Sequence, residues 1–442
     1  MNAAIATGQR AVSRRPLGRA MVWLAGLAIF FYASYGFTNW LSGLRDNVPS
    51  IVFDWERHIP FIGWTIVPYW TTNLFYAASI FLCRSRDELD TQARRLLTAQ
   101  IIAITCFILF PLKFSWPKPD VTGFAGFFYE ALGAFDRPFN QAPSLHVALT
   151  VILAAFYFRL LPPAGRWIFA GWSALVVVSV LTTYQHHFID IPAGFALGLA
   201  CVWLWPFDAP RRALEWRPAS DPRRVGLALK YTLAAALAAV VAAWIGGVAL
   251  WLFWLALALA LVALAYIGPG AALFDKSGDG RMGWPARILL APYLVGAWIN
   301  SRAWTARDAA SIEIADGVYV GCFPSRREAS QFAAIIDLTA EFDRPAREGR
   351  WASFPMLDLV APEPATLRAA ASAIEDARAS GPVLVCCALG YGRSVASVAT
   401  WLVRGGRAAS VEEALTLLRA KRPRLVLKPD QIAAITEASR EG

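Results

Sequence analysis

The chain has 442 residues, of which 57 % are hydrophobic and 17 % are charged, and its formal net charge is +10. This length predicts two or three domains, and the apolar content excludes a single water-soluble domain. The six cysteines follow neither a disulfide framework nor a metal-ligand spacing, so the sequence predicts no disulfide-rich fold and no metal or other cofactor.

Long apolar runs dominate residues 20–268. A helix needs about 20 predominantly apolar residues to cross the hydrocarbon core of a bilayer. The pattern therefore predicts an all-α, polytopic membrane bundle of about eight spans, in which six spans are followed by a two-span hairpin. The expected spans are approximately 20–42, 65–83, 96–112, 145–162, 167–183, 188–206, 225–245 and 248–268.

The charge distribution predicts how these spans are oriented. The N-terminal segment and the alternate loops on its side hold fifteen arginines, whereas the loops on the other side hold five lysines and arginines. Because loops rich in lysine and arginine stay in the cytoplasm, we assign the side with fifteen arginines to the cytoplasm. We attribute the basic residues to topology and to anionic membrane lipids as partners, and we expect no nucleic acid partner.

Four regions are expected along the chain. They are a basic cytoplasmic N-terminus at 1–19, a six-span membrane domain at 20–210, a hairpin with a juxtamembrane segment at 211–305, and a cytoplasmic domain at 306–442. The apolar centre of segment 284–304 is too short to cross the bilayer, and its flanks carry tryptophans and arginines, so we expect a helix in the interface plane.

Three of the four histidines lie where apolar runs meet loops. Ionisable groups at the edge of a membrane segment are functional candidates by default. His186 and Asp190 are four residues apart, so on a helix the carboxylate can orient the imidazole, which makes His186 a plausible nucleophile. His146 begins another span and could donate a proton to a leaving oxygen. Taken singly, either histidine could instead be an ordinary interfacial polar residue.

Three further residues are candidates for binding the phosphate group at this site. Lys118 and Arg137 lie in the connecting loop, where their charges could neutralise phosphate oxygens, and Ser144 stands two residues before His146.

The motif PSLH at 143–146, the stretch SVLTTYQHHFID at 179–190 and Lys118-Pro119 resemble the type 2 phosphatidic acid phosphatase superfamily, over roughly residues 65–206. The resemblance implies six spans, a lipid phosphate substrate and metal-independent chemistry. It implies that His186, rather than the neighbouring His187, forms a phosphohistidine, with Asp190 as its partner and His146 as the acid.

This stretch departs from the family pattern at several positions. Lys118 and Val180 stand where the family usually has arginine, so fewer guanidinium groups are available for phosphate. Leu145 and Gln185 look more like the branch that includes inositol phosphorylceramide synthases. Because that branch transfers a phospho-headgroup to an alcohol, hydrolysis and transfer both remain open for the membrane half.

A second candidate site lies at residues 383–403, which read as a buried strand, a glycine-containing turn and a helix from about Ser394 to Arg404. Cys387 at the strand end would face backbone N–H groups of the turn, including those near Gly390 and Gly392, and a helix N-terminus. This setting favours a nucleophilic thiolate. Arg393 could clamp phosphate bidentately, and Ser394 could assist release of the thiol.

The C-x5-R-S spacing, together with the rest of residues 312–435, resembles the dual-specificity protein tyrosine phosphatases. The resemblance implies an α/β cysteine-phosphatase fold, a phosphocysteine intermediate and Asp358 as the general acid. Cys386 stands where the family usually has histidine, and we expect it to be a packed side chain. A phosphoprotein and a lipid headgroup both remain possible substrates.

These features together predict a bifunctional integral membrane phosphatase of a bacterial inner membrane, with both termini in the cytoplasm. A different hypothesis is a signalling phosphatase whose spans serve only as an anchor and sensor.

Overall fold

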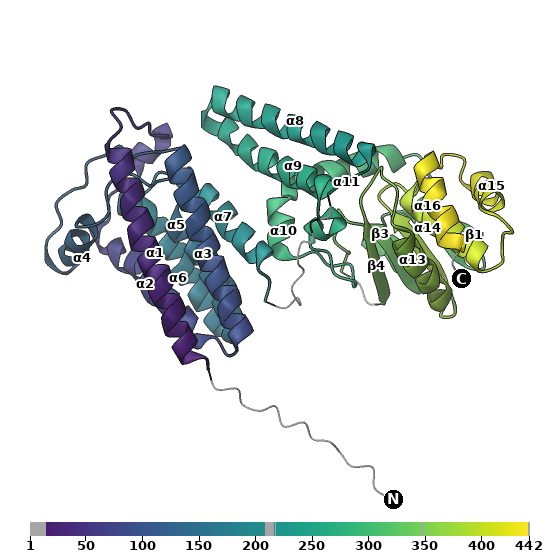
Figure 1. Ribbon diagram of the computed structural model, residues 1–442, viewed down its shortest axis with the longest axis horizontal. Helices are drawn as coiled ribbons and strands as arrows, with labels where there is room; N and C mark the ends of the chain where they lie inside the picture. Colours follow the sequence, from purple (N-terminus) through teal and green to yellow (C-terminus); the bar gives the residue numbers. More distant parts are fainter. Residues whose placement is uncertain (1–14, 208–215, 217, 347–348, 441–442) are drawn as a thin grey trace, which may run out of the picture. The chain divides into compact units, whose positions relative to one another are not determined.

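The computed structural model describes residues 15–207, 216, 218–346 and 349–440. It divides into two compact units, Met1–Arg211 and Arg212–Gly442, which are drawn in Figure 1. Most of the basic segment expected at 1–19 and the domain boundary expected near residue 210 lie outside the described residues.

The described part of the first unit is helical. Its largest buried apolar cluster joins side chains of α1, α2, α3, α5, α6 and α7, and α5 contributes ten buried residues, so this helix forms the centre of the bundle. The helices are α1 (Leu17–Gly43), α2 (Ile66–Leu82), α3 (Arg86–Leu109), α4 (Gly123–Gly133), α5 (Leu145–Leu160), α6 (Pro163–Thr182) and α7 (Asp190–Leu204), with short 3₁₀ turns η1 (Asp54–His58) and η2 (Gly63–Thr65).

Two glycines of α7 allow it to lie directly against α5. A Cβ atom at Gly194 would stand 2.5 Å from the carbonyl oxygen of Ser144, and one at Gly198 would stand 2.7 Å from that of Ala148. Small residues four apart let helix backbones approach closely. This contact brings the N-termini of α5 and α7 together, and the N–H of Ser144 donates to the carbonyl of Asp190 at 3.0 Å.

Five segments of the described residues are long and apolar enough to cross a membrane: α1, α3, α6, α8 and the stretch Gly247–Ile267. The apolar helices α5 and α7 have 16 and 15 residues, and α2 has 17. Each of the eight predicted runs therefore falls on a helix, but five candidate spans, rather than about eight, meet both criteria.

The second unit begins with a helical hairpin. Helices α8 (Pro222–Ile245) and α9 (Leu252–Ile267) lie side by side in Figure 1, joined through η3 (Gly247–Trp251), and η4 (Gly270–Phe274) follows. Many of their apolar side chains are exposed, with Trp244 at 85 % and Val248 at 80 %. Such surface is typical of a segment that lies in lipid.

The segment expected to lie in an interface forms two consecutive helices, α10 (Trp284–Leu289) and α11 (Ala291–Thr305). One side of α11 contacts the following domain, because Ser301 Oγ donates to the carbonyl of Ala388 at 2.7 Å and Arg302 donates to that of Phe323 at 2.7 Å. The remaining surface of α10 and α11 exposes large apolar side chains, including Trp284, Ile288, Val295, Trp298, Ile299 and Trp304.

The rest of the second unit is an α/β domain with a five-stranded mixed sheet in the order β1-β2-β5-β3-β4. Only β1 runs antiparallel to its neighbour. Helices α13 and α14 pack on the sheet. The elements are β1 (Ser311–Ala315), β2 (Val318–Cys322), α12 (Arg326–Ala329), β3 (Ala334–Thr339), β4 (Arg350–Met356), α13 (Pro364–Arg378), β5 (Val383–Cys387), α14 (Arg393–Arg404), α15 (Val411–Lys421) and α16 (Pro429–Arg440).

The central strand β5 positions the predicted cysteine. All five of its residues are buried, which explains the continuous apolar run that precedes Cys387. In sheets of this kind, ligands bind beyond the carboxyl ends of the parallel strands. Cys387 is the last residue of β5 and therefore stands at that edge.

Candidate active sites

The histidine motifs meet at the N-termini of α5 and α7. His186 Nδ1 lies 3.2 Å from Asp190 Oδ2, and both side chains are buried. The same carboxylate oxygen accepts the backbone N–H of His187 at 3.0 Å, which fixes its orientation. Because Nδ1 faces the carboxylate, Nε2 is the nitrogen that can react.

His146 is the second residue of α5 and is half-buried. Its ring stacks on the ring of Tyr69 from α2, with centroids 3.8 Å apart and an interplanar angle of 22°. Ser144 caps the same helix, since its Oγ accepts the N–H of Val147 at 3.4 Å. Tyr69 therefore restricts the His146 imidazole from the side of α2.

His187 has a separate set of partners. Its Nδ1 lies 3.0 Å from Glu56 Oε2, and its Nε2 lies 3.2 Å from Ser115 Oγ. Burial raises the pKa of Glu56, but hydrogen bonds from His187 and from backbone N–H groups, including that of Phe53, lower it further, so that it lies below its usual value. Both ring nitrogens of His187 are engaged, which leaves neither available for nucleophilic attack.

Of the candidate phosphate-binding cations, Lys118 lies beside the histidine motif. Its Nζ donates to Gln185 Oε1 at 2.8 Å. Burial lowers the pKa of Lys118, while the nearby Asp136 raises it; the net direction is downward. Arg137 is exposed and lies next to Gly43 at the end of α1. Within the described residues, no hydrogen bond or ion pair joins Arg137 to His146 or His186.

In the second unit, the turn after β5 surrounds the Cys387 thiol with donors. The backbone N–H of Gly390 donates to Cys387 Sγ at 3.2 Å, and Ser394 Oγ lies 3.4 Å from the same sulfur. Gly390 has a φ of +76°, and a Cβ there would stand 2.6 Å from the backbone of Gly321. A glycine is therefore required at this turn.

Neighbouring residues satisfy the carbonyl groups of this turn from outside. Ser301 donates to the carbonyl of Ala388, Arg422 donates to that of Leu389 at 3.1 Å, and the N–H of Val426 donates to that of Tyr391 at 2.9 Å. Carbonyls that point outward leave N–H groups free to point toward an anion. The turn is thus suited to binding an anion.

Arg393 begins α14 and is 3 % exposed. Its Nη2 and Nη1 contact the two carboxylate oxygens of Glu341 at 2.6 and 2.9 Å, and Nη1 also donates to the carbonyl of Met356 at 3.0 Å. Burial lowers the pKa of Arg393, but Glu341 and then Asp358 raise it above its usual value. The guanidinium is therefore held in a fixed orientation and remains charged.

Asp358 lies two residues after β4, and its carboxylate Oδ1 is 3.4 Å from Arg393 Nε. The Asp358 side chain is 45 % exposed, so it lies at the solvent-facing side of this cluster rather than in the buried core. The sequence-predicted residues Cys387, Arg393, Ser394 and Asp358 are thus brought together at one edge of the sheet.

Cys386 is fully buried and packs in a different apolar cluster from Cys387. Burial raises its pKa well above the ordinary thiol value, and the carboxylate of Asp337 raises it further. The expectation that Cys386 is a packed side chain agrees with this environment.

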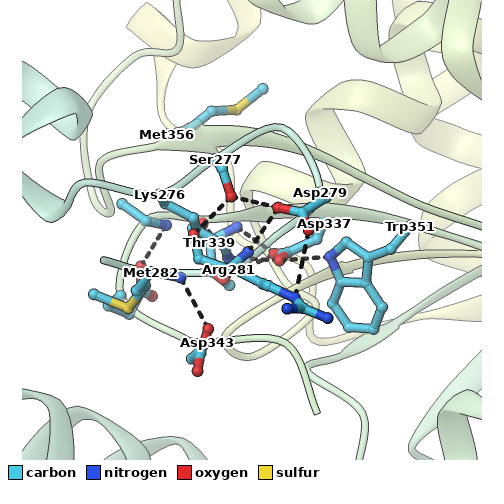
Figure 2. A network of polar contacts seen from close by, with 12 residues as sticks. Lys276, Ser277, Asp279, Arg281, Met282, Asp337, Thr339, Asp343, Trp351 and Met356 are labelled. Atoms are coloured by element: carbon cyan, nitrogen blue, oxygen red, sulfur yellow. Dashed lines mark hydrogen bonds and ion pairs between the residues drawn. The ribbon is translucent and has the colours of Figure 1, made fainter. Parts of the chain in front are cut away.

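A buried polar network connects the juxtamembrane segment to the α/β domain, as Figure 2 shows. Lys276 Nζ donates to Asp337 Oδ2 at 2.5 Å and to the carbonyl and hydroxyl oxygens of Thr339 at 2.7 and 2.8 Å. Trp351 Nε1 donates to the same carboxylate at 3.2 Å. Asp337 is therefore held in a buried ion pair.

Sequence reasoning missed Glu341, Glu56 and Tyr69. Glu341 follows β3 by two residues, so the rule that sites form at the carboxyl ends of parallel strands could have indicated it. Glu56 and Tyr69 carry no comparable signal, because their contacts cross 131 and 77 residues of chain.

Comparison with known proteins agrees with these two clusters. Residues 65–204 match the family model described as PAP2 superfamily, and residues 318–441 match the one described as dual specificity phosphatase, catalytic domain. A comparison with curated proteins gives no match.

Several solved structures are similar to about 30 % of the chain. Tk-PTP in the active form is 26 % identical and covers 30 % of this chain and 99 % of its own, with a TM-score of 0.28. PTPMT1 in complex with PI(5)P is 18 % identical, with coverages of 30 % and 96 % and a TM-score of 0.28. Human DUSP28 is 19 % identical, with coverages of 30 % and 93 % and a TM-score of 0.28.

Both expected family resemblances are therefore confirmed, over nearly the expected residues. The chain carries one region that matches the PAP2 superfamily and another that matches the dual specificity phosphatase catalytic domain, and it is a phosphoric monoester hydrolase.

Proposed function

We propose that the chain is a bifunctional integral membrane phosphatase. A histidine-based site acts on a lipid phosphate at the outer face, and a cysteine-based site hydrolyses phosphomonoesters in the cytoplasm. The observation that carries this proposal is that two nucleophile-centred clusters, His186 with Asp190 and Cys387 with Ser394, lie in separate compact units.

The membrane arrangement follows from the charge bias of the loops. We assign about eight spans, with α2, α5 and α7 crossing as shorter helices and α8 with α9 forming the final pair. Both termini are then cytoplasmic, and the exposed tryptophans of α10 and α11 lie in the interface plane. The Ala/Arg-rich composition and the family matches support a bacterial inner membrane.

At the histidine site, Nε2 of His186 attacks the phosphorus atom while Asp190 stabilises the cationic ring. His146 protonates the leaving oxygen, and water then hydrolyses the phosphohistidine. Lys118, Arg137 and Ser144 are assigned to phosphate binding. The double engagement of His187 by Glu56 and Ser115 supports His186 as the nucleophile.

At the cysteine site, the Cys387 thiolate attacks the phosphorus atom and Asp358 protonates the leaving oxygen. Arg393 and the backbone N–H groups at Gly390 and Gly392 hold the phosphate oxygens. Ser394 then assists departure of the thiolate when water attacks the phosphocysteine. The substrate of this site is a phosphoprotein or a phosphorylated lipid headgroup.

The test is a product panel on the purified full chain, comparing wild type, His186→Ala and Cys387→Ser on lipid phosphates and phosphopeptides. We expect each variant to lose a different subset of substrates. His58→Ala, which changes the one histidine outside the two motifs, is the matched control and should behave as wild type.

Three outcomes contradict parts of the proposal. If both variants lose the same substrates, the two-site assignment is wrong. If His186→Ala retains every activity, the spans serve as an anchor for a cytoplasmic phosphatase. If an alcohol-linked product forms in place of free phosphate, the membrane half is a headgroup transferase.

A further inference from the structure

The last helix of the hairpin reaches the loop that carries the proposed general acid. Tyr266, the penultimate residue of α9, donates its hydroxyl to the backbone carbonyl of Asp358 at 3.0 Å. The Tyr266 side chain is 2 % exposed. A residue of the membrane hairpin is thus in direct contact with the Asp358 loop of the phosphatase domain.

Aromatic packing fixes the direction of this hydroxyl. The Tyr266 ring stacks on Tyr231 of α8, with centroids 5.6 Å apart and an interplanar angle of 19°. Tyr231 in turn meets Tyr293 of α11 edge to face at 5.9 Å. Because rings in such an arrangement have little rotational freedom, the Tyr266 hydroxyl stays aimed at the loop.

The Asp358 loop depends on only a few such contacts. Arg393 donates to the carbonyl of Met356 before the acid, and Gln431 donates to that of Val360 after it, at 3.2 Å. Leu359, next to the acid, has a φ of +62°, in the left-handed region. Among the side-chain hydrogen bonds of the described residues, the one from Tyr266 reaches the backbone carbonyl of Asp358 itself.

We infer that Tyr266 is a positioning residue of the cysteine site, through which the membrane hairpin holds Asp358 in place to protonate the leaving oxygen. This inference rests on the proposed function of Cys387 and Asp358. General acid catalysis contributes about 10²- to 10⁴-fold to a rate, and a displacement of about 1 Å can cost about 100-fold.

The inference predicts a dependence on the leaving group. An alkoxide must be protonated as the P–O bond breaks, whereas p-nitrophenolate leaves as a stable anion without a proton. Loosening the Asp358 loop should therefore slow hydrolysis of an alkyl phosphate and spare that of p-nitrophenyl phosphate. A purely structural role would lower both rates together.

The experiment uses the full chain in detergent. Every variant also carries His186→Ala, so that the measured activity comes from the cysteine site alone. Tyr266→Phe removes the hydroxyl and keeps the ring. We expect its kcat on glycerol phosphate to fall roughly 5- to 20-fold, while its kcat on p-nitrophenyl phosphate changes less than about 2-fold. The alkaline limb of the pH profile for glycerol phosphate should weaken as well.

Tyr231→Phe is the matched control, because it deletes a hydroxyl from the same stack without touching the bond to Asp358; it should retain both rates. Tyr266→His, whose ring can still donate, is the second variant and should recover part of the glycerol phosphate rate. Thermal unfolding of each variant confirms that the fold is retained.

Equal losses on both substrates, or no loss on glycerol phosphate, would overturn the role of Tyr266. Failure of the proposed function looks different: Cys387→Ser would then keep its activity on both substrates.

Discussion

Glu341 holds both terminal nitrogens of Arg393, with oxygen–nitrogen distances of 2.6 and 2.9 Å. Both side chains are buried, with exposed fractions of 7 % and 2 %. A buried ion pair contributes little net stability, but removal of one partner leaves an uncompensated charge. The pair therefore fixes the orientation of the Arg393 guanidinium more than it stabilises the domain.

Replacement of Glu341 by glutamine should lower the free energy of unfolding by about 3 kcal/mol, because a buried guanidinium loses its counter-charge. Burial raises the pKa of Glu341, but Arg393 lowers it further, to below the usual 4.5. The ionised Glu341 carboxylate therefore stabilises the fold fully above pH 4.5, the pKa of the unfolded chain. This stabilisation is lost as the pH falls through the lower pKa of Glu341 in the folded protein. Denaturant unfolding from pH 7 to pH 3 should show a steeper loss for wild type than for Glu341→Gln; parallel curves would contradict this.

The close contact of α5 and α7 predicts a selective effect at Gly194. The Cβ of Gly194→Ala would collide with the carbonyl of Ser144 at 2.5 Å, which separates the two motif helices at a cost of about 1–3 kcal/mol. Lipid phosphate hydrolysis should fall while Cys387-dependent hydrolysis persists. Gly171→Ala on α6, where nothing lies within 4 Å of the new Cβ, is the matched control. Equal activities of the two variants would count against this contact.

Lys276 offers a test of the buried network in Figure 2. Lys276→Met leaves the Asp337 carboxylate buried without its cation, and the free energy of unfolding should fall by about 3–5 kcal/mol. Arg281→Met in the same loop breaks an ion pair whose side chains are 69 % and 51 % exposed, so it should cost under about 1 kcal/mol. Chemical denaturation of both variants measures the difference, and similar values would contradict the ranking.

Ser394 should act on the second half of the cysteine reaction. Its hydroxyl lies 3.4 Å from the Cys387 sulfur, where it can stabilise the departing thiolate. Ser394→Ala should therefore lower kcat by roughly 10-fold or more while leaving the first turnover fast. Rapid-mixing kinetics with p-nitrophenyl phosphate should show a burst of nitrophenol equal to the enzyme concentration. A slow first turnover would instead assign Ser394 to the attack step.

The sequence predicts helices well here because the apolar runs are long. Helix α3 nevertheless begins at Arg86, ten residues before the predicted run, because Ser85 caps it by accepting the N–H of Glu88 and its first turns are polar. A search for apolar runs does not detect such an extension. Helix α7 starts two residues after its predicted run, because Phe188 and Ile189 form a turn. Helix α5 starts at the predicted residue but ends at Leu160, before the pair Pro162 and Pro163.

The cysteine cluster could be predicted because its members are close in sequence: a strand, a turn and a helix position Cys387, Gly390 and Ser394 within eight residues. Contacts between residues that are far apart in the sequence could not be predicted. Glu341 meets Arg393 across 52 residues, and Tyr266 meets Asp358 across 92. Neither pairing follows from a local pattern, because each depends on how strands and helices pack.

The ion pair between Lys276 and Asp337 also bears on how this protein can be dissected. A fragment cut at residue 306, where the composition becomes that of a soluble domain, would lose the lysine and strand the aspartate in an apolar interior. A fragment that keeps this pair must begin before Lys276, and the compact unit that contains both residues begins at Arg212 and includes the apolar hairpin of α8 and α9. Expression of this whole unit apart from the first one should therefore require detergent.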